Sequence, residues 1–181
     1  RIARTGGIPL VDVLRPPMSP VQEAIKRGLD LTLASLAFLA IFWVWLVIYL
    51  FVRLDQEGPA LDRLECVGRG GKRFHLLRFR CYTKTVSSDG SEIARPTPIG
   101  YLLRRLEFDR MPQLFNVIAG DLSLVGPRPM TPDFFESILD EEPLYQHCLS
   151  VKPGVTGLAQ IHGKRHNMAS KLRYDLSYIN N

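Results

Sequence analysis

Hydrophobic residues are concentrated in one uninterrupted run near the start of the chain. Residues 31–52 contain no charged side chain. A helix of that length, at a rise of about 1.5 Å per residue, matches a bilayer hydrocarbon core of about 30 Å. Ser19 and Pro20 supply a helix cap and a first-turn proline just upstream. The pattern therefore predicts a membrane-embedded helix over residues 20–53.

Two other interpretations of this run are open from the sequence. A signal peptide is shorter, begins nearer the N-terminus and ends in small residues. A buried helix of a globular protein needs surrounding layers that the rest of the chain could scarcely supply. Lys26 and Arg27 before the run and Arg53 after it suit the level of lipid headgroups. Because both flanks are basic, charge does not set an orientation, and both ends could lie on one face of the membrane.

The polar part of the chain predicts short elements. Residues 1–19 are rich in glycine and proline and predict a linker from an upstream region. Residues 64–80, LECVGRGGKRFHLLRFR, predict two strands joined around Gly70 and Gly71. Residues 83–94 are polar and predict a loop. We expect residues 54–181 to form a cytosolic domain that stops before its natural end.

Helical patterns follow in the second half of the chain. A helix is expected to begin near Pro98, with an apolar face formed by Ile99, Leu102, Leu103 and Leu106. Asp109 can cap a second helix that runs through Val117 and is closed by Gly120. Further helices are predicted at 132–150 and 168–179, separated by the turn-rich residues 152–157. The expected fold class is therefore mostly α, with a small β-hairpin element and an N-terminal membrane helix.

Charge and cysteine content narrow the range of partners. The net charge is +5, and residues 66–88 hold six basic side chains and no acidic one. Such a patch suits lipid headgroups or phosphate-bearing substrates when it follows a membrane segment. It lacks the aromatic interleaving and the fold signature of a nucleic-acid-binding protein, so we expect no nucleic-acid partner. The three cysteines have no metal-ligand spacing, which favours a reducing compartment.

One acid and two arginines suggest phosphoryl transfer. An aspartate at a helix start, such as Asp109, lies where backbone N–H groups and the helix dipole favour anions. Arg110 follows it directly. Arg128 lies between Pro127 and Pro129, which restrict the backbone and could aim a guanidinium group whose donors match phosphate oxygens. An aspartate in this position is most often only a cap, however, and turn arginines also pair with helix C-termini.

Several ordered motifs between residues 26 and 181 resemble those of the bacterial sugar transferases, which are monotopic phosphoglycosyl transferases. The matching stretches are KRGLDL at 26–31, GP at 58–59, VGRGGKRFHLLRFR at 67–80, DRMPQLFNVIAGDLSLVGPRP at 109–129 and VKPGVTGLAQIHGK at 151–164. In that family the acid of the D-x-x-P-Q-L motif attacks a nucleotide diphosphate sugar and forms a phosphosugar-enzyme intermediate. The resemblance gives this role to Asp109, with Mg²⁺ bridging the pyrophosphate oxygens.

The resemblance also implies the remaining site residues and the partners. Candidate substrate- and phosphate-binding residues are Arg78, Arg80, Gln113, Asn116, Pro127, Arg128, Pro129 and Lys152. The implied reaction transfers a sugar 1-phosphate from a UDP-sugar to polyprenyl phosphate, in exopolysaccharide, O-antigen or glycoconjugate assembly. The implied location is the bacterial cytoplasmic membrane with the domain facing the cytosol, in contact with membrane lipids and in a chain that could form homo-oligomers.

Two departures from the family pattern leave alternatives open. The family usually has glutamate directly after the nucleophile, where this chain has Arg110. Either Arg110 neutralises phosphate charge while Glu107 or Asp121 joins Asp109 as a metal ligand, or the chain is a catalytically silent relative that binds nucleotide or polyprenyl phosphate as a scaffold. The family also breaks its membrane helix with a Ser-Pro pair, which this chain replaces with Phe42 and Trp43. A re-entrant helix is expected, with a straight span as the alternative.

Overall fold

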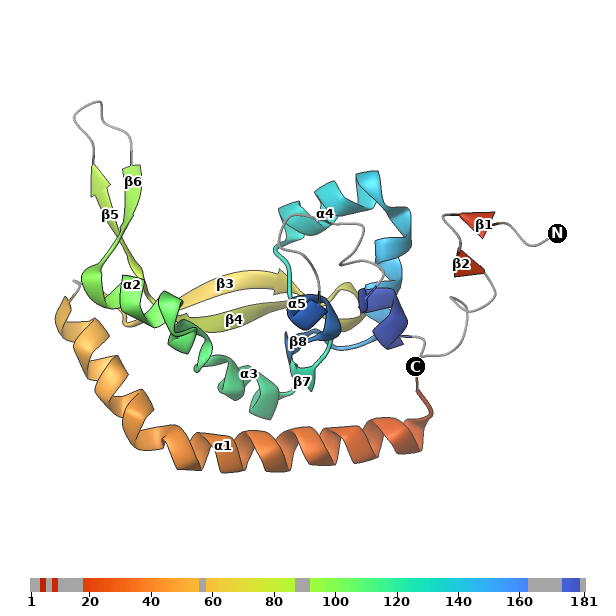
Figure 1. The fold of residues 1–181 in the computed structure, drawn as a ribbon, viewed down its shortest axis with the longest axis horizontal. Coiled ribbons are helices and arrows are strands. Elements are labelled where there is room, and N and C mark those ends of the chain that lie inside the picture. Colours follow the sequence, from red (N-terminus) through yellow and green to blue (C-terminus); the bar gives the residue numbers. More distant parts are fainter. Residues whose placement is uncertain are drawn as a thin grey trace.

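A long helix runs along one side of a domain made of short helices and two-stranded sheets (Figure 1). The computed structural model describes residues 4–5, 8–9, 18–55, 58–86, 92–162 and 174–179. The long helix, α1, spans Pro20–Asp55 and continues through Phe42 and Trp43, while Figure 1 shows it bending partway along its length. The Ser19 N–H donates to the side-chain oxygen of Gln22, and the Gln22 N–H donates to the hydroxyl oxygen of Ser19. These two reciprocal bonds form a capping box. The predicted helix start is thus confirmed.

One face of α1 packs on the domain and the other is exposed. Phe38 and Trp45 meet Phe115 with ring centroids 4.8 Å and 5.7 Å apart, and Trp45 also contacts Phe79. On the opposite face, large apolar side chains such as Trp43 are exposed. Of the most apolar 18-residue stretch of α1, only 11% is buried. Among the described residues, α1 is the one helix long and apolar enough to cross a membrane. A core helix would be mostly buried, which argues against that interpretation.

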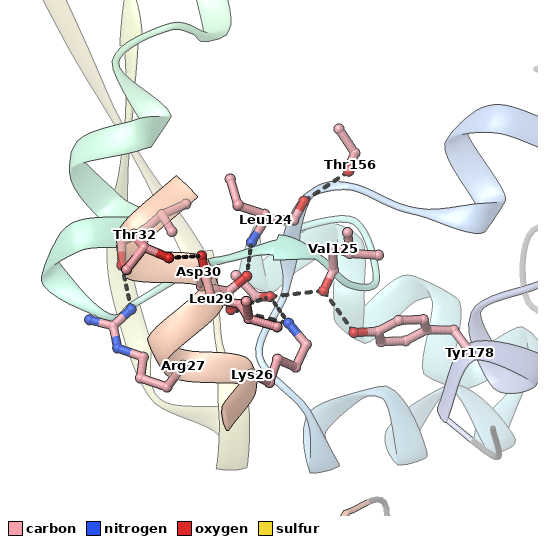
Figure 2. Close-up of polar contacts among 11 residues, drawn as sticks. Lys26, Arg27, Leu29, Asp30, Thr32, Leu124, Val125, Thr156 and Tyr178 are labelled. Atoms are coloured by element: carbon pink, nitrogen blue, oxygen red, sulfur yellow. Dashed lines mark hydrogen bonds and ion pairs between the residues drawn. The ribbon is translucent and has the colours of Figure 1, made fainter. Parts of the chain in front are cut away.

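The polar N-terminal part of α1 is tied to the domain by hydrogen bonds (Figure 2). The Asp30 carboxylate accepts from the Leu124 N–H at 3.1 Å and from Lys26 Nζ at 3.1 Å. Lys26 Nζ also contacts the hydroxyl of Ser123. Arg27 donates to the carbonyls of two residues at the end of a short helix, α3 (Gln113–Ala119). The basic residues expected at the headgroup level are therefore bound to protein groups here.

Two antiparallel hairpins follow α1. The first pairs β3 (Leu61–Val67) with β4 (Arg73–Phe79) through a 3-10 turn, η2 (Arg69–Gly71), and confirms the predicted hairpin. Gly70 and Gly71 have φ of 66° and 77°, a left-handed conformation that favours glycine. The second pairs β5 (Tyr82–Val86) with β6 (Glu92–Pro96), so the loop predicted at 83–94 is wrong at both strands. Threonine, valine and isoleucine favour strands once a partner strand is present. The polar composition of this segment instead indicated a loop.

Helix α2 (Pro98–Arg105) begins where predicted, with the Thr97 hydroxyl accepting from the Gly100 N–H at 2.9 Å. Its apolar face differs from the expectation, because Leu103 is buried while Leu102 and Leu106 are 53% and 50% exposed. The helix approaches Cys81 so closely that a Cβ on Gly100 would lie 2.2 Å from the Cys81 carbonyl oxygen. A helix of two turns held by this contact buries only the side chains beside it.

The remaining elements close the domain. They are η3 (Phe108–Arg110), α3, β7 (Ser123–Val125), α4 (Pro132–Glu141), η4 (Pro143–Ser150), β8 (Gly154–Thr156) and α5 (Leu158–His162). The helix predicted over 132–150 is divided at Pro143, whose ring and missing N–H interrupt an α-helix. Residues 174–179 are helical, and the rest of the helix predicted at 168–179 lies outside the described residues. The short strands β7 and β8 pair in parallel.

Candidate active site

A cavity of about 320 Å³ collects charged side chains from segments far apart in the sequence. Its wall is formed by strands β3, β4 and β8, by helices α2 and α5, by the 3-10 helix η3, by the start of α3 and by the turn after β7. Four arginines and three acids line it: Arg78, Arg104, Arg110, Arg128, Asp62, Glu107 and Asp109, together with Gln113, Pro129 and Gln160. The cavity thus has an excess of positive charge and a few carboxylates, which suits an anionic ligand.

Asp109 lies in η3, half-buried in the wall of this cavity. It does not cap α3, which begins at Gln113 after Pro112 and has no side-chain cap, so the predicted capping role is wrong. Pro112 has no N–H to donate to the Phe108 carbonyl, and the chain instead closes a 3-10 turn, with Met111 N donating to Phe108 O at 3.2 Å. The Asp109 carboxylate is therefore available to a ligand rather than tied to a helix end.

Burial and neighbouring arginines act on Asp109 in opposite directions. Burial raises the pKa of the Asp109 carboxyl above its ordinary value, because the charged form loses contact with water. The positive charges of Arg110, Arg104 and Arg78 favour the carboxylate and oppose this rise, so the net pKa is raised less than burial alone would raise it. The arginines therefore help to keep a partly desolvated carboxylate ionised.

Arg110 pairs with a carboxylate on the turn before it. Arg110 Nη1 lies 3.5 Å from Glu107 Oε2, and both side chains line the cavity. Glu107 has φ 58°, and it is the one non-glycine residue in the described part of the chain with a positive φ. This left-handed conformation is sparsely populated for side chains other than Gly, Asn and Asp. The backbone turn brings Glu107 back toward Arg110, so its carboxylate lines the same cavity as Asp109.

The turn that carries Arg128 is held by the parallel pairing of β7 and β8. Gly126 N donates to Thr156 O at 2.9 Å, and Gly154 N donates to Pro127 O at 2.8 Å. A Cβ on Gly154 would lie 2.1 Å from Gly126 N, so the two backbones can approach this closely only because both residues are glycines. The turn thereby places Arg128 on the same cavity as Asp109, although the two residues lie on different elements.

Five candidate residues lie outside this cavity: Arg80, Asn116, Asp121, Pro127 and Lys152. Buried Asn116 accepts from Leu77 N at 2.9 Å and donates to His75 O at 2.8 Å, which joins α3 to β4. The structure thus gives Asn116 a packing role. Asp121 is exposed next to Asn116, and Arg80 Nε donates to Tyr82 O at 3.2 Å. Lys152 lines a second cavity beside α1.

Among the lining residues with a charged or amide side chain, three were not anticipated from the sequence: Asp62, Arg104 and Gln160. Asp62 lies opposite Arg78 in the antiparallel register of β3 and β4, so extending the predicted hairpin by two residues would have found it. Arg104 is one of two consecutive arginines on α2, and its guanidinium carbon lies 5.1 Å from the Tyr82 ring centroid. Only the packing of α2 decides which of the two arginines reaches the cavity.

The carboxylates of this cavity are candidate ligands for Mg²⁺. The described residues contain no group of three or more His, Cys, Asp or Glu side chains placed to bind a metal ion. Mg²⁺ is usually bound by one or two carboxylates plus substrate phosphates and water, and Asp109 and Glu107 line the same cavity. Asp121, the third candidate ligand, lies elsewhere. The donor set therefore fits a metal ion that arrives with, or bridges, a phosphate group.

Comparison with known proteins gives a family match over most of the chain. The model described as "Bacterial sugar transferase" matches residues 21–181. The chain is 33% identical over 172 residues to UDP-N-acetylgalactosamine-undecaprenyl-phosphate N-acetylgalactosaminephosphotransferase of Aeromonas hydrophila, covering 90% of this chain and 41% of that protein. It is 35% identical over 190 residues to UDP-glucose:undecaprenyl-phosphate glucose-1-phosphate transferase of Escherichia coli (strain K12), covering 99% of this chain and 41% of that protein.

A shorter relative is matched over most of its own length. The chain is 37% identical over 161 residues to the uncharacterized sugar transferase EpsL of Bacillus subtilis (strain 168), covering 87% of this chain and 78% of that protein. The chain spans about two fifths of the length of the two larger relatives. In this chain the family match, residues 21–181, includes nearly all of α1 and every residue that lines the charged cavity.

Proposed function

Because this chain belongs to the bacterial sugar transferase family, we propose that it transfers a sugar 1-phosphate from a UDP-sugar to undecaprenyl phosphate. The product, a polyprenyl diphosphosugar, would begin the assembly of an exopolysaccharide or a related glycan. The observation that carries this proposal is the cavity that brings the half-buried carboxylate of Asp109 together with four arginines. A nucleophile surrounded by phosphate-binding groups is what a phosphoryl transfer requires.

The proposed reaction has two displacements at one phosphorus atom. A carboxylate oxygen of Asp109 attacks the phosphorus that bears the sugar, a new O–P bond forms, and the bond to the bridging oxygen breaks so that UMP leaves. The lipid phosphate then attacks the same phosphorus, the bond to Asp109 breaks, and the carboxylate is regenerated. Dividing one difficult step into two easier ones is the general advantage of a covalent intermediate.

The arginines of the cavity supply the charge that this reaction needs. A pyrophosphate brings negative charge next to the Asp109 carboxylate, and repulsion would oppose their approach. Arg78, Arg104 and Arg128 reach the cavity from three different elements, and guanidinium groups bind phosphate oxygens through pairs of N–H donors. They would hold the pyrophosphate and stabilise the charge that develops on the leaving UMP.

We propose that Asp109 and Glu107 hold Mg²⁺ together with the pyrophosphate of the substrate. When bound, it would offset the charge of the pyrophosphate oxygens and polarise the phosphorus under attack. The ion pair between Glu107 and Arg110 suggests how this chain does without the usual glutamate at position 110. Glu107 would provide the second carboxylate from the preceding turn, while Arg110 adds a phosphate-binding cation.

We propose that α1 enters one leaflet of the membrane and leaves on the same face. Its N-terminal part is hydrogen-bonded to β7, and Val52 near its C-terminal end is buried against Phe79 and Leu103 of the same domain. A helix that crossed the bilayer would carry one of these contact regions to the other side. The exposed apolar side chains between the two ends would lie in lipid, with the domain at the cytosolic surface.

A second candidate function is favoured by Arg110 itself. If the arginine prevents metal binding, the chain would be a silent relative that binds nucleotide or polyprenyl phosphate as a scaffold. The deciding experiment measures UMP release by the full chain in lipid nanodiscs that contain undecaprenyl phosphate and Mg²⁺, across a panel of UDP-sugars. Release that is lost in Asp109→Asn supports the transferase. Absence of release with every sugar, together with its appearance in Arg110→Glu, would establish the silent relative.

A further inference from the structure

A second cavity, of about 350 Å³, lies beside the first turns of α1. No residue that lines it also lines the cavity around Asp109. Its charged groups come from α1, η2 and the segment before β8, and comprise four cations and two acids: Lys26, Arg27, Arg69, Lys152, Glu23 and Asp30. This cavity therefore has an excess of positive charge in a place that the proposed transfer reaction does not use.

Two of the four cations are already neutralised within the protein. Lys26 Nζ lies 3.1 Å from an Asp30 carboxylate oxygen, and Arg69 Nη2 lies 2.6 Å from a Glu23 carboxylate oxygen. Those two pairs use both acids of the cavity. The charges of Arg27 and Lys152 are left without a carboxylate partner among the described residues that line the cavity.

Arg27 and Lys152 both approach Gly120 and both line the second cavity. Arg27 Nη1 and Nη2 donate to the carbonyls of Val117 and Ile118, whereas Lys152 makes no hydrogen bond or ion pair with any residue the structure describes. A Cβ on Gly120 would lie 3.2 Å from Arg27 Nη2 and 3.7 Å from Lys152 Nζ, so these nitrogens are at most about 7 Å apart. The ends of two like-charged side chains thus lie close together.

The surroundings of Lys152 on balance disfavour its charged form. Burial lowers the pKa of the Lys152 ammonium, and the positive charges of Arg27 and Arg69 lower it further. Asp30 and Asp121 act in the opposite direction without reversing the shift. An anion placed between Arg27 and Lys152 would remove the repulsion and give the lysine a hydrogen-bond acceptor.

We propose that this cavity binds a phosphate-type anion, a phosphate monoester or diester, between Arg27 and Lys152. A tetrahedral oxyanion can accept from both cations at charge-assisted distances of about 2.7–2.9 Å when they are separated by this gap. The guanidinium of Arg27 has N–H groups beyond those bound to carbonyls. The anion comes from a lipid headgroup or from a soluble phosphate compound, since the cavity lies directly before the apolar run of α1.

Residue-resolved labelling of lysines tests this proposal on the wild-type chain in detergent. Acetylation of each lysine is followed by mass spectrometry in chloride, in inorganic phosphate and in short-chain phosphatidic acid at equal ionic strength. At a ligand concentration about ten times Kd, labelling of Lys152 should slow about tenfold, because the bound anion covers the amine. Lys72, which is exposed on the hairpin turn and does not line the cavity, serves as the matched control and should label at an unchanged rate.

The two phosphate sources give different concentration dependences. Protection of Lys152 at much lower concentrations of phosphatidic acid than of inorganic phosphate identifies a lipid headgroup, and equal concentrations identify a soluble anion. A thermal-unfolding series supplies a second measurement: Lys152→Gln should lose the stabilisation by phosphate that Lys72→Gln, a substitution outside both cavities, keeps. Protection that chloride reproduces, no protection by either phosphate, or equal stabilisation of Lys152→Gln and Lys72→Gln would overturn the proposal.

Discussion

Arg110 and Glu107 form an ion pair on the wall of the candidate catalytic cavity, with Arg110 Nη1 3.5 Å from Glu107 Oε2. The pair depends on the left-handed backbone of Glu107, which turns the chain between α2 and η3. The two residues lie on either side of the proposed nucleophile in the chain, and the positive charge of Arg110 favours the ionised form of Asp109. An arginine at position 110 is thus accompanied by an acid that the local backbone brings next to it.

Removing the charge of Arg110 should move the acid limb of the pH profile. Arg110 lowers the pKa of Asp109, so Arg110→Gln raises that pKa further above its ordinary value. Attack requires the ionised carboxylate, and a higher pKa means that activity falls at a higher pH as the solution is acidified. The measurement is kcat/KM for UMP release against pH. An acid limb that stays in place would show that Arg110 does not act on the nucleophile.

Two consecutive arginines on α2 offer a matched pair of variants. Arg104 lines the cavity, whereas Arg105 does not. Arg104→Gln should raise KM for the UDP-sugar by about tenfold or more, since a hydrogen bond to a charged group contributes about 1.5–3 kcal/mol. Arg105→Gln should change KM by less than about fivefold, because a surface charge contributes about 0–1 kcal/mol. Equal effects of the two substitutions would mean that only the overall charge of α2 matters.

The close approach of β7 and β8 should make Gly154 intolerant of a side chain. Gly154→Ala places a Cβ 2.1 Å from Gly126 N, and backbone cannot move aside easily. We expect a loss of about 1–3 kcal/mol in the free energy of unfolding, with lower activity because the Arg128 turn shifts. Gly28→Ala is the control: nothing lies within 4 Å of its Cβ, and alanine in a helix should add up to about 1 kcal/mol. Thermal unfolding in detergent measures both changes.

The arrangement of α1 in the membrane can be tested with single cysteines. The three native cysteines are buried, so background labelling should be low. Gln22→Cys and Asp55→Cys place exposed thiols near the two ends of α1. An impermeant maleimide should label both positions in inside-out vesicles and neither in intact cells. Labelling of one end from each side would show that α1 crosses the bilayer.

The elements that the sequence predicts closely are those with local causes. The start of α1 at Pro20 follows from a capping box and an apolar run, and the β3–β4 hairpin from a Gly-Gly turn between two strands. These signals lie within a few residues of one another and predicted the elements closely. The β5–β6 hairpin was missed because its polar strands become strands only when they pair with each other.

The candidate site shows the same division. Asp109, Arg110, Arg128 and the motifs around them could be named from the sequence, and they do line one cavity. Asn116 belongs to the same motif, but both its amide oxygen and its amide nitrogen bond to the backbone of β4. Lys152 carries the charge expected of a phosphate ligand, yet it faces Arg27 beside α1. Residue type and spacing do not specify which side of an element faces a cavity.

The sequence by itself determined the elements whose causes are local: an apolar helix long enough to enter a membrane, a glycine-linked hairpin, and a short list of charged residues in ordered motifs. Only the tertiary structure decided which of those charges meet. Contacts between residues tens of positions apart depend on how α2, α3 and the β7–β8 pair pack, and this packing results from many weak contacts summed over the whole domain. The same packing separated two positively charged cavities that a linear reading of the basic residues could not distinguish.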